Sequence, residues 1–311
     1  MGVNQMEYIA DKTEFKFKNT AVTLGKFDGL HLGHQLLINK VLEQKSKGYL
    51  SVVFTFLIHP NSLFSKKEVE LLYVEDEKRR KIEQMGLDVM ISYPFNNETA
   101  SMEAEDFIRE VLINRLDAKV IVVGSDFGFG HKRKGNVELL REMSKVYGYE
   151  LIVFDKRKIS DLEVSSSYIR KELDAGNMDK VKEFLGRPYS IMGKVEHGRK
   201  IGRTLGFPTT NLIPISAKLL PLSGVYASNT IIDGKSYPGI TNIGNNPTVG
   251  ETKEKRVETY IFDFDEDCYG KTIEVELLAF ERPEIKYDNL SDLKEQMEKD
   301  IIFGRNYFAG L

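Results

Sequence analysis

Short apolar runs alternate with helical patterns along the first half of the chain. The runs are rich in β-branched and aromatic residues and are hydrophobic almost throughout, as in strands buried on both faces. They cover residues 21–24, 51–56, 89–93, 120–123 and 151–154. Repeated alternation of strand and helix predicts an α/β domain with a doubly wound, Rossmann-like parallel sheet and helices on both faces. Ligands of such sheets bind beyond the carboxyl ends of the strands.

Three helices are predicted between these strands, over residues 33–47, 103–116 and 137–147. The last of them has Asn136 as its N-cap and Gly148 as its stop signal.

The pattern changes from Tyr189 onward, where strand patterns follow one another closely. Their connections are too short for helical crossovers, which predicts a mainly antiparallel sheet in a small β-barrel or sandwich. These strands cover residues 190–195, 225–232, 236–243, 257–264 and 273–280.

Helical patterns also border this second half of the chain. Two short helices, 168–174 and 178–185, precede it, and a helix over 291–303 closes the chain. The natural boundary is near Gly186. We therefore expect an α/β domain over residues 1–185 and a small antiparallel barrel domain with a terminal helix over 186–311.

Composition and charge narrow the class of protein. The length of 311 residues suits two domains at about 150 residues each. A formal charge of −3 disfavours a protein that wraps nucleic acid. The single Cys268 excludes a disulfide framework and suits a reducing compartment. No apolar run reaches the roughly 20 residues of a membrane-spanning helix and no secretory signal is recognisable, so we expect a cytoplasmic protein.

The loop after the first strand carries the strongest motif. Residues 25–34 contain three glycines and, as H-x-G-H, His31 and His34 at the start of the next helix. One interpretation is a glycine-rich turn with surface histidines. The other, favoured by both histidines at this junction, is a phosphate site where imidazolium groups and free helix N–H groups stabilise developing charge.

Two further loops carry polar residues at the same edge of the sheet. Residues 124–135 contain Asp126, suited to ribose hydroxyls, and a basic run over 131–134 that is either a phosphate contact or a solvated surface. Ser165, Ser166 and Arg170 begin a later helix, and hydroxyls with an arginine one turn on can clamp a polyphosphate.

These motifs together resemble a known family. H-x-G-H followed by a Ser-rich segment resembles the nucleotidylyltransferase superfamily. More narrowly, G-x-F-D-G-x-H-x-G-H, G-x-D-F-x-F-G-H-K-R-K-G and S-S-x-x-I-R resemble the FMN adenylyltransferase (FAD synthetase) module of bifunctional bacterial flavin enzymes. The segment 54–60 is also similar, but Leu57 and Ile58 depart from that family's pattern, so no role is assigned to His59. The resemblance implies a site made of Gly25, Phe27, Asp28, His31, Gly33, His34, Asp126, Ser165, Ser166 and Arg170.

The second half carries a glycine-rich and basic stretch that becomes rigid at Phe207-Pro208. Thr209 and Asn211 alternate along an extended segment, so their side chains share one face and offer oxygen ligands suited to Mg²⁺. In a later strand, Glu258 shares a face with Tyr260. By itself such a carboxylate is either an exposed charge or a positioned base.

The order of these motifs resembles riboflavin kinase. The match comprises G-R-x-x-G-R-T-L-G-F-P-T-x-N, the strand from Gly224, the segment 242–248 and V-E-x-x-x-F-D-F-D. The resemblance implies that Glu258 is the catalytic base and that Thr209 and Asn211 bind Mg²⁺ with the nucleotide. Thr210 replaces the family's usual Ala and is expected to point away from the metal. The implied nucleotide-binding residues are Gly198, Arg203 and Gly206.

The two resemblances imply a bifunctional flavin-cofactor enzyme. Its substrates and products would be riboflavin, FMN, FAD, ATP, ADP and pyrophosphate, with ATP as co-substrate, Mg²⁺ as cofactor, and no nucleic acid or membrane partner. An adenylyltransferase for nicotinamide or pantetheine nucleotides would not explain the barrel motifs. A flavin carrier without catalysis predicts that Glu258 or H-x-G-H is missing, and both are present. A tRNA-charging protein is disfavoured by the net charge and the lack of a Lys-rich second signature.

Overall fold

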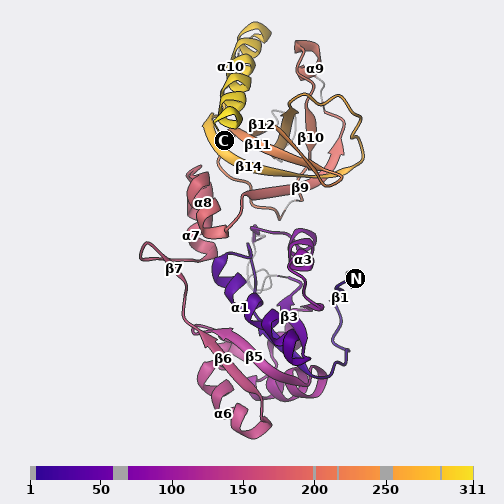
Figure 1. Ribbon diagram of the computed structural model, residues 1–311, viewed down its shortest axis with the longest axis vertical. Coiled ribbons are helices and arrows are strands. Elements are labelled where there is room, and N and C mark those ends of the chain that lie inside the picture. The colour runs from indigo at the N-terminus through magenta and orange to yellow at the C-terminus, as the bar shows by residue number, and fades with distance from the viewer. Residues whose placement is uncertain are drawn as a thin grey trace. The chain divides into compact units, whose positions relative to one another are not determined.

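The chain folds into two compact units, Met1–Ser165 and Ser166–Leu311 (Figure 1). The computed structural model describes residues 5–58, 69–198, 201–215, 217–245, 255–287 and 289–310, without the side chains of Ile201, Arg203 and Asn245. His59 and residues 246–248 of the segment 242–248 therefore lie outside the described residues. The two short helices before Gly186 belong to the second unit, so the boundary expected at Gly186 remains a prediction about where an independent fragment begins.

A six-stranded sheet of parallel strands forms the first unit, in the order β1-β4-β3-β2-β5-β6. Its strands are β1 (Glu7–Ala10), β2 (Thr20–Leu24), β3 (Leu50–Phe56), β4 (Val89–Tyr93), β5 (Ala118–Gly124) and β6 (Glu150–Phe154). The five predicted strands are confirmed, and β1 adds a short edge strand beside β4. From β2, the chain adds β3 and β4 on one side and β5 and β6 on the other. The order thus reverses between β2 and β5, which is the switch point where doubly wound sheets bind ligands.

Two helices of the first unit end at the residues that the sequence predicts. The helix predicted over 33–47 is α1 (Leu32–Glu43) continued by the 3₁₀ turn η1 (Gln44–Lys47), and it ends at Gly48 with a φ of 84°. The helix α6 (Val137–Tyr147) has the predicted ends: the Asn136 side chain accepts the Leu139 N–H at 2.9 Å, and Gly148 has a φ of 75°.

Two helical regions differ from the prediction. Residues 103–116 are helical, but α5 (Ala104–Asp106) continues into the wider π-helix η2 (Phe107–Arg115), as in the 3.0 Å bond from the Leu116 N–H to the Val111 carbonyl. The helix α3 (Glu75–Gln84) was missed because Ile82 is its only apolar residue, which leaves no hydrophobic period to detect. The remaining short elements are α4 (Asn97–Ala100), η3 (His131–Arg133), β7 (Lys158–Ile159) and β8 (Leu162–Glu163).

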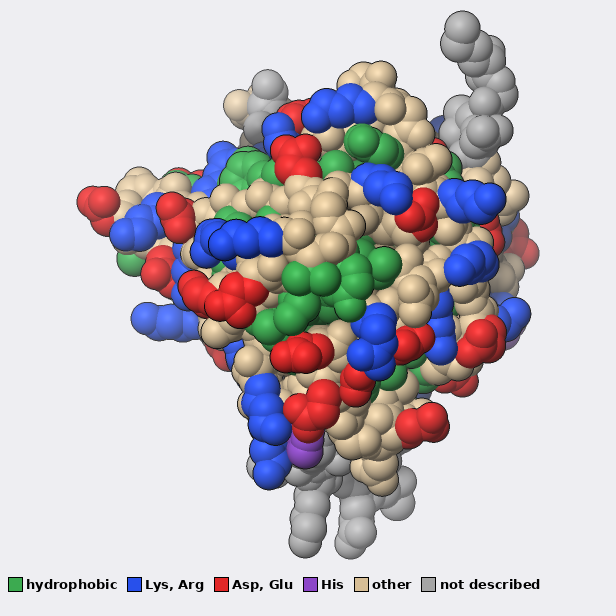
Figure 2. Space-filling model, turned by 90° about the horizontal axis from the view of Figure 1, so that it is seen from below, with side chains coloured by type: hydrophobic (Ala, Val, Ile, Leu, Met, Phe, Trp, Pro, Cys, Tyr) green, Lys and Arg blue, Asp and Glu red, His purple; other side chains and the backbone are tan. Residues whose placement is uncertain are grey.

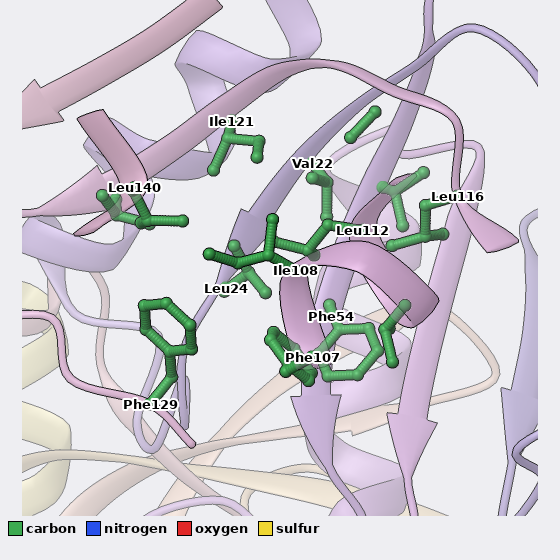
Figure 3. Close-up of a cluster of buried hydrophobic side chains, with 14 of the residues drawn as sticks. Val22, Leu24, Phe54, Phe107, Ile108, Leu112, Leu116, Ile121, Phe129 and Leu140 are labelled. Carbon is green, nitrogen blue, oxygen red and sulfur yellow. The ribbon is translucent and has the colours of Figure 1, made fainter. Parts of the chain in front are cut away.

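Successive residues of each strand pack into two apolar layers, one on each face of the sheet. On one face, Ile38 of α1 and Ile82 of α3 pack with Ala21 of β2. On the other face, Ile108 and Leu112 of η2 and Leu140 of α6 pack over the strands; Figure 3 shows them beside Val22, Leu24, Phe54 and Ile121. Burial on both faces explains the continuous apolar runs and fixes the strand ends that carry the loops.

A closed barrel of six antiparallel strands forms the core of the second unit, in the order β10-β13-β12-β11-β14-β9. Its strands are β9 (Tyr189–Glu196), β10 (Thr210–Leu212), β11 (Gly224–Ile232), β12 (Lys235–Asn245), β13 (Lys255–Ile261) and β14 (Thr272–Pro283). The predicted antiparallel barrel is confirmed, and the alternative of a sandwich is wrong. The three-residue strand β10, expected only as an extended segment, pairs with both β9 and β13 and so closes the barrel.

Four helices accompany the described barrel: α7 (Ser166–Asp174), α8 (Met178–Leu185), α9 (Ile201–Leu205) and α10 (Leu290–Ala309). The terminal helix α10 packs along β11 and β12. Gly304 permits this close approach, because a Cβ there would lie 2.6 Å from Ile240 and 2.8 Å from Phe262.

Charged side chains of both signs are interspersed on the face shown in Figure 2, around a smaller apolar area. Neither sign dominates that face, in keeping with the formal charge of −3. Among the residues that the structure describes, no helix combines the length and apolar character needed to cross a membrane.

Candidate functional site

The turn between β2 and α1 is held by its own buried side chains. Phe27, Gly29 and Leu30 have φ angles of 50°, 83° and 45°, the left-handed region that non-glycine residues rarely adopt. Phe27 and Leu30 are both fully buried in the layer beneath α1. Their burial offsets the backbone cost and gives the turn one defined shape.

Asp28 ties this turn to a neighbouring segment. Its Oδ1 accepts hydrogen bonds from the backbone N–H of Leu72 at 2.8 Å and of Tyr73 at 3.4 Å, and the residue is only 7% exposed. Phe27 and Asp28 therefore have visible structural roles, and their assignment to nucleotide binding remains a prediction.

His31 is both the N-cap of α1 and half of a stacked pair. Its Nδ1 accepts the His34 N–H at 3.3 Å, and the two imidazole rings lie 3.6 Å apart, inclined by 15°. The alternative of surface histidines, which the sequence disfavoured, does not hold for His31, which is 7% exposed. Nδ1 accepts this bond with its lone pair. The role of His31 in stabilising a phosphate remains a prediction. Gly33 leaves room for this ring, since a Cβ there would lie 3.2 Å from it.

The loop after β5 lies beside this turn, because β2 and β5 are neighbours and parallel. Asp126 is exposed and forms a 3.5 Å ion pair with Lys156. Gly25, which follows β2, sits directly on the Phe27 ring, where a Cβ would approach to 3.2 Å. The topology thus brings the first two motif loops together at the switch point.

The third predicted segment crosses the division between the units. Ser165 ends the first unit, and α7 of the second unit begins at Ser166, with Arg170 about one turn later. The roles of Ser165, Ser166 and Arg170 in phosphate binding remain predictions.

In the second unit, cross-strand register aligns the predicted kinase residues. Asn211 of β10 lies opposite Glu258 of β13, and Glu258 lies opposite Asn242 of β12. On its other side, Asn211 faces Glu196 of β9. Paired residues share a face of the sheet. The neighbouring pair Val257 and Leu212 is fully buried inside the barrel, so the polar row lies on the outer face.

Asn211 is suited to a ligand that the described chain does not provide. The residue is 7% exposed, and its Oδ1 has no hydrogen-bond partner among the described residues. Gly198 packs directly over this amide, because a Cβ there would collide with it. A buried carbonyl oxygen without a partner is costly, and a hard cation would satisfy it. The residues present therefore fit Mg²⁺.

The residues around Asn211 follow the predicted alternation. Thr210 lies on the opposite face, opposite the buried Thr259, and its hydroxyl donates to the Thr259 carbonyl at 3.3 Å. This confirms that Thr210 points away from Asn211. Gly206 has a φ of 92°, which favours glycine at the turn before Phe207-Pro208. The side chain of Arg203 lies outside the described residues.

Sequence reasoning missed Glu284, which lies at the end of the polar row. Its carboxylate rests on Gly244, where a Cβ would collide with Glu284 and lie 3.2 Å from Asn242 Nδ2. No motif signals this contact, because Glu284 follows β14 and Gly244 lies in β12, and β11 separates these two strands in the barrel.

Comparisons with known proteins agree with this division into two sites. The family model for FAD synthetase matches residues 14–168, and that for riboflavin kinase matches residues 185–308. Curated proteins named bifunctional riboflavin kinase/FMN adenylyltransferase are similar along nearly the whole chain. The protein of Buchnera aphidicola (subsp. Acyrthosiphon pisum) is 37% identical, covering 93% of this chain and 94% of its own. This chain belongs to the bifunctional riboflavin kinase/FMN adenylyltransferase family.

Other relatives agree with this membership. The family members of Bacillus subtilis and Escherichia coli K12 are 35% and 34% identical and cover 94% and 93% of this chain, and 93% and 92% of their own. A solved structure named as a macrolide-efflux protein from Streptococcus pneumoniae is 30% identical, with a TM-score of 0.85, and covers 97% of this chain and 99% of its own. The fold is thus shared along the whole chain.

Proposed function

We propose that this protein makes FAD from riboflavin in two ATP-dependent steps, each at its own site. The observation that carries this is the match of two family models, in order, to two regions that each contain one of the motif clusters. The barrel converts riboflavin and ATP to FMN and ADP. The α/β unit converts FMN and a second ATP to FAD and pyrophosphate.

In the kinase step, Glu258 accepts the proton of the ribityl 5′-hydroxyl as that oxygen attacks the γ-phosphate. The bond from the γ-phosphorus to the bridging oxygen breaks, and ADP leaves with the electron pair. Glu258 needs hydrogen-bond reach to the hydroxyl more than a shifted pKa. Thr209 and Asn211 would hold Mg²⁺, which supplies charge neutralisation on the phosphates. Gly198, Arg203 and Gly206 contact the nucleotide.

In the adenylyl-transfer step, a phosphate oxygen of FMN attacks the α-phosphorus of ATP and pyrophosphate leaves. The attacking group is already an anion, so no protein base is needed. His31 donates from Nε2 to the phosphate, and the free N–H groups at the start of α1 favour the same charge. The proposed ATP site also includes His34, Gly25, Gly33, Asp126, Ser165, Ser166 and Arg170.

We also infer a cytoplasmic location, with small-molecule substrates and neither nucleic-acid nor membrane partners. The buried, free Cys268 and the net charge of −3 support this.

The test supplies the full-length protein with riboflavin, ATP and Mg²⁺ and identifies the flavins by chromatography. We expect FMN first and FAD after it. Glu258→Gln is expected to slow FMN formation by about a hundredfold to ten-thousandfold while FAD formation from supplied FMN stays normal. No FMN from the unsubstituted protein, or equal loss of both activities in folded Glu258→Gln, would contradict the proposal.

A further inference from the structure

Hydroxyl side chains are linked across part of the barrel interior. Thr259 of β13 and Thr241 of β12 lie opposite each other in register, and their Oγ1 atoms are 2.8 Å apart. Thr241 also donates to Ser228 Oγ of β11 at 2.7 Å. On the other side, Thr210 of β10 donates to the Thr259 carbonyl at 3.3 Å. These four residues, which we call the hydroxyl chain, connect the neighbouring strands β10, β13, β12 and β11.

The hydroxyl chain is satisfied by its own members. Ser228, Thr241 and Thr259 are fully buried. A hydroxyl has one proton, so Thr241, which donates to Ser228, accepts its other bond from Thr259. The three hydroxyls therefore point in one direction, and in such a series each hydrogen bond strengthens the next. Because the site is buried, removing the central hydroxyl deprives both neighbours of a partner and costs more than one ordinary bond.

The hydroxyl chain lies directly behind the polar row that contains the proposed kinase residues. Three of its members are immediate neighbours in sequence of members of that row. The neighbouring pairs are Thr210 with Asn211, Thr259 with Glu258 and Thr241 with Asn242. Successive residues of a strand point to opposite faces, so the hydroxyls are on the inner face and the polar row is on the outer face. The bonds run across the strands and therefore oppose any shift of one strand against the next.

Thr230 shows that a buried hydroxyl of this barrel is not always bonded. It lies in β11, two residues after Ser228, and is fully buried as well. Its Oγ1 has no hydrogen-bond partner among the residues that the structure describes. Thr230 lies opposite Tyr237, whereas the polar row crosses the same strand at Asn242. The bonded hydroxyls thus gather at the level of the polar row.

We propose that the hydroxyl chain positions Asn211 and Glu258 for the kinase reaction, with Thr241 as its central positioning residue. This rests on the proposed function of the barrel. Proton transfer to Glu258 and cation binding by Asn211 both depend on the spacing between β10 and β13. A displacement of about 1 Å in a catalytic site can cost about a hundredfold in rate. The hydroxyl chain fixes this spacing from inside the barrel, without contacting a substrate.

The first test compares FMN formation by the full-length variants Thr241→Val and Thr230→Val. Both replacements keep the shape of the side chain and remove one buried hydroxyl. We expect kcat to fall by about tenfold or more in Thr241→Val, because the strands that carry the polar row are no longer linked. Thr230→Val should keep the wild-type kcat, because its hydroxyl has no described partner to lose. FAD formation from supplied FMN should be unchanged in both variants.

Two further variants separate positioning from stability. Thr241→Ser keeps the hydroxyl and should recover most of the kcat that Thr241→Val loses. Ile191→Val shortens a fully buried side chain of β9 and should lower the unfolding temperature without lowering kcat. Each variant is assayed well below its own unfolding temperature, measured by circular dichroism. An equal loss of kcat in Ile191→Val and Thr241→Val would overturn the inference, because general loosening of the barrel would then explain both.

Thr210→Val tests the link to β10 and decides the question if Thr241→Val does not fold. It removes the bond to the Thr259 carbonyl beside Asn211. The Mg²⁺ concentration that gives half of the maximal rate of FMN formation should rise by about tenfold, as for other residues that orient a metal ligand. A wild-type kcat and Mg²⁺ dependence in either folded variant would overturn the inference. An unsubstituted protein that makes no FMN would instead overturn the proposed function.

Discussion

At the residue scale, His31 combines a structural and a chemical role in one ring. Its Nδ1 caps α1 through the 3.3 Å bond from the His34 N–H, and Nε2 is the proposed donor to a phosphate. His31→Asn keeps a capping oxygen, so it should unfold as the wild type does. His31→Ala should lower the free energy of unfolding by about 1 kcal/mol, the usual loss of an N-cap. Both should lose most FAD formation and keep FMN formation.

Denaturant unfolding and the two separate assays check this prediction. If His31→Asn kept full FAD formation while His31→Ala lost it, His31 would act only through the helix, and the proposed donation from Nε2 would be wrong.

Replacing Asn211 should reduce activity without reducing stability. Its buried Oδ1 has no partner among the described residues, so Asn211→Leu removes an unsatisfied group of similar size. Without Mg²⁺ we expect the free energy of unfolding to stay the same or to rise by about 1–3 kcal/mol, because the variant no longer buries an unsatisfied oxygen. The rate of FMN formation should fall strongly and should respond only weakly to the Mg²⁺ concentration. A variant that unfolds easily but phosphorylates riboflavin normally would show that this oxygen serves the fold.

Sequence reasoning found the motif residues but not all of their neighbours. The spacing of H-x-G-H placed His31 and His34 at a helix start, and alternation separated Thr210 from Asn211. The meeting of the loops after β2 and β5 depends on these strands being adjacent, and strand order is not encoded in any local pattern.

At the element scale, the end of β14 carries a half-buried acid, Glu281, whose charge is influenced by Asp300 of α10. The pairing of β14 with β11 skips Glu281, which lies in a bulge between the paired residues Phe280 and Arg282. Arg282 forms a bidentate pair with Asp300 of α10, at 2.8 and 2.6 Å. Burial and then the Asp300 carboxylate raise the pKa of Glu281 to about 7, against the opposing charge of Arg282.

This raised pKa gives stability a defined pH dependence. Between its ordinary 4.5 and about 7, the folded protein keeps a proton on Glu281 that the unfolded chain has lost. The contribution of Glu281 to the free energy of unfolding is therefore greatest at low pH and falls across this interval. Glu281→Gln should remove this fall and stabilise the protein at pH values above 7 relative to wild type.

Denaturant unfolding at several pH values, compared with the exposed control Glu295→Gln on α10, checks this. A Glu281→Gln protein whose stability changed with pH as in the wild type would contradict the role of Glu281.

Strands and helices were predicted correctly where their burial produces a regular hydrophobic pattern in the sequence. The strands of the sheet are buried on both faces and α6 has strong caps, so pattern and structure agree there. The helix α3 was not predicted because two of its three buried residues are charged. Glu77 is 1% and Lys78 6% exposed, and neither contributes to a hydrophobic period. A helix stabilised by buried charged side chains has the sequence of an exposed one.

At the scale of the whole molecule, α7 and α8 decide where a kinase fragment should begin. They belong to the second unit, and Val181, Phe184 and Leu185 of α8 are fully buried. The Leu222 N–H donates to the Leu173 carbonyl of α7 at 3.0 Å, and a Cβ at Gly176 would lie 3.2 Å from the Phe280 ring of β14. These helices therefore cover apolar surface of the barrel that a start at Gly186 would expose.

A fragment that begins at Ser166 should fold and phosphorylate riboflavin, since the polar row of Asn211 and Glu258 lies wholly within it. A fragment that begins at Gly186 should keep the activity but unfold at least about 5 °C lower, because each fully buried apolar side chain contributes about 1.5–3 kcal/mol. Thermal unfolding by circular dichroism and FMN formation by chromatography measure both. Equal unfolding temperatures would favour the boundary at Gly186. A folded fragment from Ser166 without kinase activity, beside an active full-length protein, would mean that the kinase site needs residues from the first unit.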